Sequence, residues 1–178
     1  MLDKTFVPYL SKEAIAGQVN RLAAELKLKY EKEKPLFIAV LNGSFMFASD
    51  LFKQLDFDAE ICFIKLASYK GTKSTGQVVS AIGLDVTLKN RHVVVLEDIV
   101  DTGRTLNHFL PELQNHHPAS LSLCVLLHKP DATIFSIQID YTGFTIPNRF
   151  VVGYGLDYDG FGRNLPEIYQ LEIAETIT

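Results

Sequence analysis

The segment that most constrains the fold is 92–105, where a short β-branched apolar run meets acidic residues and then a loop rich in threonine and glycine. Residues 92–96 have the composition of a strand that is buried on both faces of a parallel sheet. Glu97 and Asp98 follow at the carboxyl end of this run, which is where open α/β sheets bind their ligands. The segment therefore predicts an α/β protein with a ligand site at the end of this strand.

The loop Asp101-Thr102-Gly103-Arg104-Thr105 comes next and precedes a predicted helix. Small side chains, hydroxyls and free backbone N–H groups at a helix start favour a phosphate dianion. Glu97 and Asp98 would accept hydrogen bonds from hydroxyl groups of the same ligand. The acids and the loop together indicate a binding site for a phosphorylated sugar.

The rest of the chain alternates predicted strands and helices, which indicates a mainly parallel sheet covered on both faces. Apolar runs predict strands at 36–41, 61–66, 78–84, 121–127, 134–139 and 150–152. Apolar stripes predict helices after Ser11, after Gly43 and over 106–113. Pro111 would kink or end the third helix, because proline removes one hydrogen bond of the helix and clashes with the preceding turn.

The length and net charge of the chain limit the kinds of molecule that it is expected to bind. The 178 residues suit one domain, 1–178, and the net charge of −4 gives no electrostatic footprint for nucleic acid or an anionic membrane. Neither a membrane-spanning run nor a signal peptide is evident. We expect a cytoplasmic protein with a small-molecule substrate, no nucleic-acid partner and no membrane. Cys62 and Cys124 lie in apolar runs and are expected to be buried, reduced thiols.

Four segments together resemble the type I phosphoribosyltransferases, and three of them narrow the resemblance to the members that act on 6-oxopurines. They are 97–105, Leu41-Asn42-Gly43-Ser44, Ser68-Tyr69 followed by Ser74-Thr75-Gly76, and 150–158 with Arg163 beyond it. Their order and spacing match the family over residues 6–171. The resemblance implies the type I phosphoribosyltransferase fold, with a mainly parallel central sheet flanked by helices and a small hood contributed by the N-terminal and C-terminal segments.

The resemblance also implies an activity. It is the Mg²⁺-dependent transfer of the 5-phosphoribosyl group from phosphoribosyl pyrophosphate to hypoxanthine, guanine or xanthine, which gives IMP or GMP and pyrophosphate in purine salvage. The sequence does not rank the three bases. A homodimer or homotetramer is the assembly that the family favours.

Residues 97–105 would bind the phosphoribosyl group. By resemblance, Glu97 and Asp98 hold the ribose hydroxyls, and Asp101 is similar to the general base that faces purine N7. The remaining residues of the loop would cradle the 5-phosphate; they are Thr102, Gly103, Arg104 and Thr105. Two adjacent acids on their own also suit a solvated turn or a helix cap, but that leaves the neighbouring Thr-Gly loop unexplained.

The purine would be bound by four residues from later segments. The resemblance implies that Lys129 donates to the 6-oxo group, that Phe150 stacks on the ring, and that the backbone of Val151 and Asp157 reads the far edge. Considered without the resemblance, Lys129 would be interpreted as an exposed surface lysine and Phe150 as an aromatic residue of the hydrophobic core. The resemblance decides between these readings.

The pyrophosphate and the metal would lie on other loops. Asn42 and Gly43 correspond to the family's pyrophosphate loop, in which a cis non-proline peptide is typical, and Arg163 would pair with the departing pyrophosphate. Asn42 stands where many relatives carry Lys or Arg, so one charge contact is missing. By resemblance, the metal ligands would be Glu97, Asp98 and Asp157, which agrees with the preference of Mg²⁺ for oxygen donors and retained waters. Taken alone, Asp157 suits an ordinary acidic turn equally well.

Ser68 and Tyr69 start a polar loop that resembles the family's catalytic flap, and we favour a lid over the alternative of a flexible tether. Among other functions, a phosphate-loop NTPase requires G-x-x-x-x-G-K-[ST], which the chain lacks, and a dinucleotide site requires a third glycine after Gly153 and Gly155. The remaining rival is a regulator with this fold that senses phosphoribosyl pyrophosphate and binds nucleic acid. It would need a basic surface, which this acidic chain does not indicate.

Overall fold

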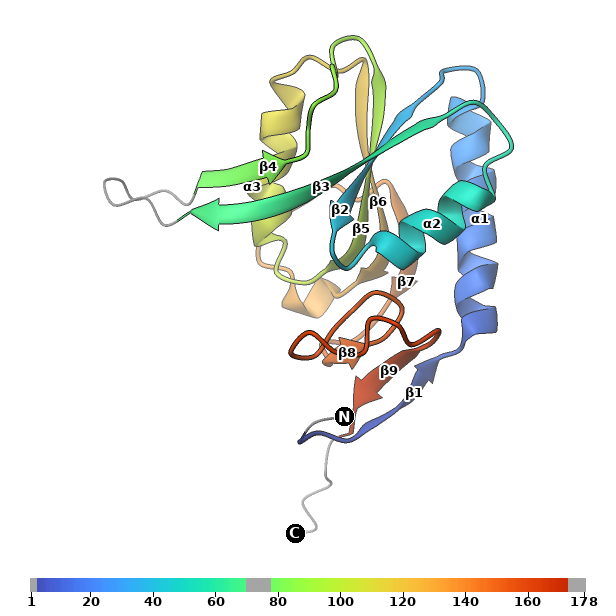
Figure 1. The fold of residues 1–178 in the computed structure, drawn as a ribbon, viewed down its shortest axis with the longest axis vertical. Helices are drawn as coiled ribbons and strands as arrows, with labels where there is room; N and C mark the ends of the chain where they lie inside the picture. The colour runs from blue at the N-terminus through green and yellow to red at the C-terminus, as the bar shows by residue number, and fades with distance from the viewer. Residues whose placement is uncertain (1–2, 70–77, 173–178) are drawn as a thin grey trace.

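The computed structural model describes residues 3–69 and 78–172. Figure 1 shows a twisted central sheet with helices on both faces and a smaller sheet below it. The central part contains α1 (Lys12–Tyr30), β2 (Leu36–Leu41), α2 (Phe45–Lys53), β3 (Glu60–Tyr69), β4 (Val78–Ile82), β5 (His92–Val100), α3 (Arg104–Gln114), β6 (Ser120–His128), the 3-10 turn η1 (Pro130–Ala132) and β7 (Tyr141–Thr145). The smaller sheet contains β1 (Phe6–Leu10), β8 (Val151–Val152) and β9 (Ile168–Leu171).

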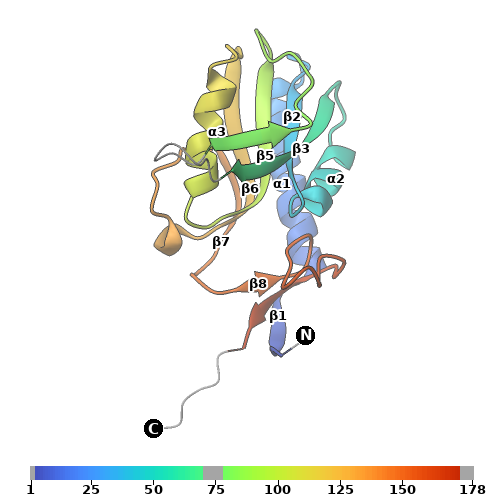
Figure 2. The same cartoon turned by 60° about the vertical axis from the view of Figure 1, so that its left-hand side comes forward.

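The central sheet has the strand order β4-β3-β2-β5-β6-β7 (Figure 2). All neighbouring strands are parallel except β4, which pairs antiparallel with β3. The inner strands are apolar on both sides because both of their faces are covered; the first five residues of β2 are buried. The prediction of a mainly parallel α/β sheet is confirmed.

Helices cover the two faces of the sheet unequally. Five residues of α1 that the sequence places on one stripe are buried, and α1 and α2 pack against the same face of the sheet. The hydroxyl of Ser11 accepts a hydrogen bond from the Ala14 amide at 3.2 Å and so caps α1, as predicted. On the other face, α3 buries Leu106, Phe109 and Leu113.

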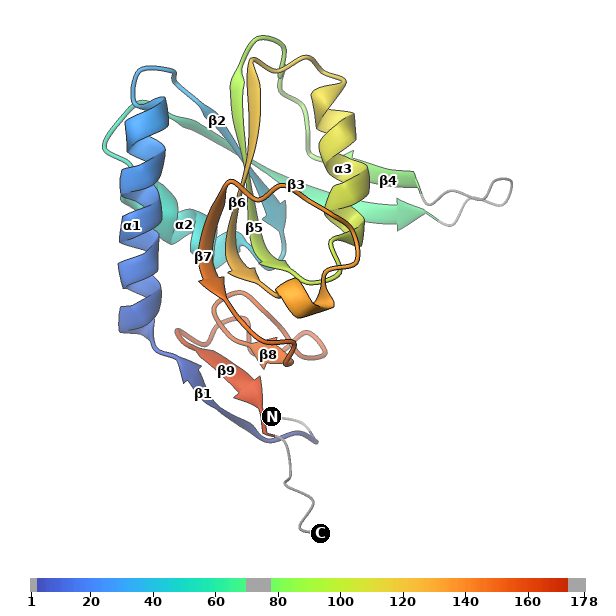
Figure 3. The same cartoon turned by 180° about the vertical axis from the view of Figure 1, so that it is seen from behind.

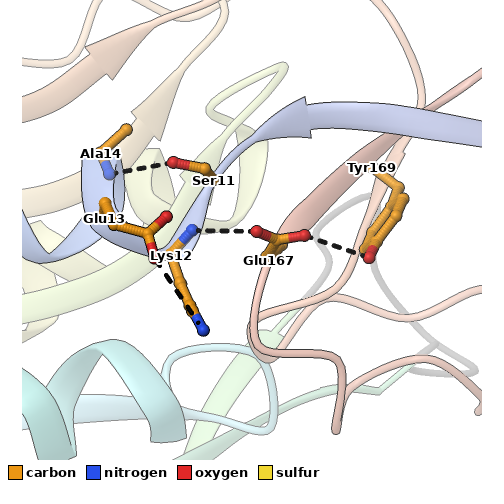
Figure 4. Close-up of polar contacts among 6 residues, drawn as sticks. All are labelled: Ser11, Lys12, Glu13, Ala14, Glu167 and Tyr169. Atoms are coloured by element: carbon orange, nitrogen blue, oxygen red, sulfur yellow. Dashed lines mark hydrogen bonds and ion pairs between the residues drawn. The ribbon is translucent and has the colours of Figure 1, made fainter.

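The terminal segments form one antiparallel sheet in the order β1-β9-β8. This sheet lies beyond the carboxyl ends of β5 and β6 (Figure 1, Figure 3). Glu167, just before β9, accepts hydrogen bonds from the Lys12 amide at 3.4 Å and from the Tyr169 hydroxyl at 3.2 Å (Figure 4). The small sheet is thereby joined to the first turn of α1.

The prediction of a strand at 134–139 is wrong. This segment is not paired as a strand, and the edge strand is β7, which begins at Tyr141. The alternation of apolar residues is real, because Phe135, Ile137 and Ile139 are partly buried while their neighbours are exposed. The backbone, however, is hydrogen-bonded elsewhere: the amides of Ile134 and Phe135 both donate to the carbonyl of Thr102.

Two boundaries also differ from the prediction. β5 continues to Val100, so Glu97 and Asp98 lie inside the strand, and Glu97 pairs with Val125 of β6. Helix α3 passes through Pro111 and ends at Gln114, so the early stop does not occur. The helix has only one turn left after Pro111, and tertiary packing of Leu113 on the sheet favours its continuation.

Cys62 and Cys124 are free thiols, as expected, and Cys124 is fully buried. Cys62 is only partly buried, so the expectation of full burial is wrong for this residue. Among the helices of the described residues, none combines the length and the apolar character required to span a bilayer.

Candidate active site

The 101–105 loop connects the end of β5 to the start of α3. Gly103 precedes the helix with φ 76°, and a side chain there would lie 2.7 Å from Ile137 Cδ1. The positive φ favours glycine at this position, whereas the end of the Ile137 side chain could move aside. Residues 99–106 and Glu97 line a cavity of about 110 Å³. The N-terminus of α3 and its backbone amides border this cavity, which favours an anion.

Glu97 and Asp98 leave β5 on alternate sides of the strand. Their carboxyl groups nevertheless lie close enough for each to shift the pKa of the other. Glu97 lines the cavity of the 101–105 loop, whereas the Asp98 carboxylate lies beside Gly43, where any side chain would overlap it. The two acids therefore stand between the 101–105 loop and the 41–43 loop. Sequence reasoning placed them together but could not assign each to its own face.

Both acids are costly to ionise in the free protein. Burial, and then the charge of Asp98, raise the pKa of Glu97 well above its usual range. Burial also raises the pKa of Asp98, although the Ile99 amide and the Arg163 guanidinium partly oppose this effect. Among the described residues, Glu97 Oε2 is a buried side-chain oxygen without a hydrogen-bond partner. Such an atom is suited to accept from a ligand hydroxyl or to bind a cation.

The 41–43 loop packs against the 153–163 loop. The Leu41–Asn42 peptide is cis, and a side chain at Gly155 would overlap the Gly43 carbonyl. Arg163 donates to the Gly155 carbonyl at 2.7 Å and forms an ion pair with Asp157 at 2.6 Å. The structure thus brings together the loops that contain Asn42, Gly43, Asp157 and Arg163.

Lys129 and Asp101 form an ion pair in which Nζ lies 3.0 Å from Oδ2. Lys129 is only 5% exposed, so it is not the surface lysine that its local sequence would suggest. Its amide donates to the Val100 carbonyl at 2.9 Å, which joins the ends of β6 and β5. Asp101 remains half exposed. One buried cation and one accessible carboxylate thereby meet at the edge of the sheet.

Phe150 immediately precedes β8 and is 45% exposed, whereas Val151 is buried. The Phe150 ring contacts Tyr158 edge to face, with centroids 5.7 Å apart, and Phe6 at 6.2 Å. Because two aromatic neighbours support the ring and part of it stays open, Phe150 can stack on a flat ligand.

Sequence reasoning missed several residues that support the loops. The hydroxyl of Thr133 contacts the main chain of both Asp101 and Lys129, and Tyr154 donates to Asp50 on α2 at 2.7 Å. Thr133 belongs to no local pattern that indicates a site, and Tyr154 lies within the 150–158 segment without a role that its neighbours in sequence indicate. The contacts join segments far apart in the sequence, so only the fold shows them.

Ser68 and Tyr69 form the end of β3, opposite the start of β4. The loop predicted as a flap continues over residues 70–77, including Ser74-Thr75-Gly76, which lie outside the described residues.

No three His, Cys, Asp or Glu side chains within residues 3–69 and 78–172 are grouped as a metal site. Asp157 in particular is paired with Arg163 and also accepts from the Gly160 amide. The donors near the loops are nevertheless carboxylate oxygens, and Glu97 Oε2 lacks a partner. These donors suit Mg²⁺, which keeps several waters and takes oxygens from bound phosphates.

We expect Glu97→Gln to stabilise the free protein at pH 8. The raised pKa means that folded Glu97 retains a proton that the unfolded chain releases above about pH 4.3. Stability from this group is full below that pH and is lost as the pH rises toward the folded-state pKa. Glutamine does not ionise, so the variant should have the higher unfolding free energy at pH 8, and the two proteins should differ little at pH 4.

Urea unfolding at the two pH values measures this effect. Glu112→Gln, on the exposed side of α3, is the matched control and should change stability by no more than about 0.5 kcal/mol. If Glu97→Gln is no more stable than the wild type at pH 8, the buried carboxylate is not a source of instability.

Comparisons with known proteins agree with this geometry. A model of the phosphoribosyl transferase domain matches residues 8–159. A hypoxanthine-guanine phosphoribosyltransferase of Lactococcus lactis is 43% identical over 169 residues, covering 94% of this chain and 92% of the relative. A hypoxanthine-guanine-xanthine phosphoribosyltransferase of Tritrichomonas foetus is 41% identical over 169 residues, with the same coverages. A solved hypoxanthine-guanine phosphoribosyltransferase of Bacillus anthracis superposes with a TM-score of 0.87 at 36% identity, over 96% of this chain and all of the other.

Proposed function

This chain belongs to the phosphoribosyltransferase family, among its hypoxanthine-guanine members, and from that membership we propose how its residues divide the reaction. The protein is a purine-salvage enzyme that transfers a 5-phosphoribosyl group to a 6-oxopurine. The observation that best supports the division of roles is the ion pair between the buried Lys129 and the half-exposed Asp101 at the start of the 101–105 loop. The pair places the Lys129 ammonium group, a hydrogen-bond donor, next to the Asp101 carboxylate at the proposed sugar-phosphate site.

The phosphoribosyl group would occupy the cavity between Glu97 and the 101–105 loop. The amides of Thr102, Gly103, Arg104 and Thr105 would bind the 5-phosphate at the start of α3. Glu97 and Asp98 would accept from the ribose hydroxyls, which gives the unpartnered Glu97 oxygen a donor. Positive charge develops on the ribose ring as the bond to pyrophosphate breaks, and the nearby carboxylates stabilise it.

The purine would lie between Phe150 and the ion pair. Lys129 would donate to the 6-oxo oxygen, Asp101 would accept the proton of N7, and the exposed face of Phe150 would stack on the ring. The backbone of Val151 and Asp157 would contact the opposite edge of the base. The ranking of hypoxanthine, guanine and xanthine depends on these backbone contacts.

Pyrophosphate would depart past the 41–43 loop. The backbone amides of Asn42 and Gly43 would contact it, and Arg163 would exchange part of its pairing with Asp157 for the phosphate oxygens. Mg²⁺ would be held by Glu97, Asp98 and Asp157 together with ligand oxygens and water, and it would neutralise the charge of the leaving group. Asn42 is exposed and supplies no charge of its own.

We further propose that residues 1–178 act as one domain in which the β1-β9-β8 sheet is the hood, and that Ser68 and Tyr69 begin a lid. A cytoplasmic homodimer or homotetramer that does not bind nucleic acid or membrane completes the proposal. The cytoplasmic location rests on the substrate, since a highly charged sugar phosphate does not cross a bilayer unaided. The alternative of a nucleic-acid-binding regulator finds no support in the relatives described above.

We expect phosphoribosyl pyrophosphate with Mg²⁺ to stabilise the folded protein. At a concentration one hundred times its dissociation constant, linkage gives roughly 2.7 kcal/mol. Thermal unfolding with and without the ligand measures the shift, and ATP with Mg²⁺ should give a much smaller one. Glu97→Gln should lose most of the shift while Glu112→Gln retains it. Equal shifts with ATP would contradict the proposed sugar-phosphate site.

A further inference from the structure

Thr133 lies between the two segments that carry Asp101 and Lys129. It follows η1 directly, and its hydroxyl oxygen is 2.9 Å from the Asp101 carbonyl oxygen and 2.9 Å from the Lys129 carbonyl oxygen. The same oxygen is 3.3 Å from His128 Nε2. A hydroxyl has one proton to donate and lone pairs that accept. The single Thr133 proton is therefore shared between the two carbonyl oxygens, and an N–H at Nε2 of His128 can donate to the Thr133 oxygen.

The residues after Thr133 extend this connection. The amides of Ile134 and Phe135 donate to the Thr102 carbonyl at 3.1 and 3.2 Å. A Cβ added at Gly103 would be 3.2 Å from the Phe135 carbonyl oxygen, so the chain approaches closely there. Residues 133–135 thus form hydrogen bonds with the main chain at Asp101 and Thr102 and pass close to Gly103. They support the loop that would bind the 5-phosphate.

Asp101 and Lys129 are 28 positions apart in the chain, and their side chains meet at 3.0 Å. On a 6-oxopurine, the oxygen and N7 lie on the same edge. Both side chains can reach that edge only if their backbones keep a fixed separation. The Thr133 hydroxyl contacts the backbone carbonyls of both Asp101 and Lys129 and so links the two segments.

We propose that Thr133 is a positioning residue that holds Asp101 and Lys129 in register with one edge of the purine. This inference rests on the proposed roles of that pair. Thr133 acts through the main chain of the two residues and does not contact the substrate. A misplacement of about 1 Å at a reacting group can cost roughly 10²-fold in rate. Loss of the hydroxyl should therefore affect the purine step and leave binding of the sugar phosphate nearly unchanged.

The test compares Thr133→Val, which removes the hydroxyl at nearly constant shape, with Thr133→Ser, which retains it. We expect Thr133→Val to lower kcat/KM for hypoxanthine by about tenfold or more, with KM for phosphoribosyl pyrophosphate within about twofold. Thr133→Ser should stay within about threefold of the wild type. Thr145→Val, at an exposed threonine at the end of β7, is the matched control and should have no effect.

A double-mutant cycle with Lys129→Gln separates positioning from general stability. If Thr133 acts through the pair, the loss in the double variant is smaller than the product of the single losses. Independent losses, or equal losses for hypoxanthine and phosphoribosyl pyrophosphate, would overturn the inference. If Thr133→Val unfolds below the assay temperature, Thr133→Ala, which also lacks the hydroxyl, is compared with Thr133→Ser instead.

The outcome is distinct from a failure of the proposed function. A wild-type protein without transferase activity would contradict the proposed function itself. Wild-type kinetics in an active Thr133→Val variant would overturn only the role of Thr133.

Discussion

The protein is expected to use hypoxanthine or guanine about 10⁴–10⁵ times more efficiently than adenine, measured as kcat/KM. Lys129 is buried, and its ammonium group can only donate hydrogen bonds. A 6-oxo oxygen accepts such a bond, whereas the 6-amino group of adenine would leave one N–H of the buried ammonium group without an acceptor, beside the bond to Asp101. The ratio of kcat/KM values is expected to be large because the wrong base would leave a buried hydrogen-bond donor without an acceptor, which costs more than a difference in size.

Lys129→Gln tests the origin of this preference. A glutamine amide presents either a donor or an acceptor, so the gap between the two bases should narrow, mainly through loss of activity with 6-oxopurines. Lys89→Gln changes an exposed lysine in the same way and should leave the preference unchanged. Efficient use of adenine by the unmodified enzyme would contradict the role of Lys129, although phosphoribosyl transfer would stand.

Replacement of Asp101 should lower kcat by about 10²–10⁴, the usual contribution of a general base, with affinity for phosphoribosyl pyrophosphate within a few-fold. Two variants are informative because Asp101 also pairs with Lys129. Asp101→Ala removes both the base and the partner of the buried ammonium. Asp101→Asn retains a carbonyl oxygen for Lys129 but cannot accept the N7 proton at neutral pH.

Both variants should therefore lose turnover, and Asp101→Asn should keep the greater stability. Steady-state kinetics and thermal unfolding measure the two effects separately. Asp131→Asn on η1 is a nearby exposed acid and serves as the control. A rate for Asp101→Asn close to that of the wild type would reject the role of Asp101 as a base.

The parts of the fold that could be predicted are those with a strong local pattern. β5 is indicated by its β-branched apolar run and α1 by apolar residues that recur with the helical period. Gly43 indicates the turn between β2 and α2. The segment 134–139 shows the limit of such patterns. It has the alternation of a strand, yet its amides bond to Thr102, and no feature of the segment itself indicates that distant partner.

The same distinction applies to the candidate site. Residues 97–105 are contiguous, so their chemistry can be read from the chain. The pairing of Lys129 with Asp101 joins the ends of two neighbouring strands, and the approach of Gly155 to Gly43 joins two loops more than 100 residues apart. These contacts depend on strand order. The burial of Lys129, which is central to base selection, also follows from the fold and not from its neighbours in sequence.

The most direct test of the central claim is a product assay with hypoxanthine, phosphoribosyl pyrophosphate and Mg²⁺. IMP and pyrophosphate are quantified in the same reaction. We predict that they form in equal amounts, that guanine gives GMP in the same way, and that Asp101→Asn suppresses both products together. Release of pyrophosphate without nucleotide, or the absence of both products while the protein still binds phosphoribosyl pyrophosphate, would contradict the claim.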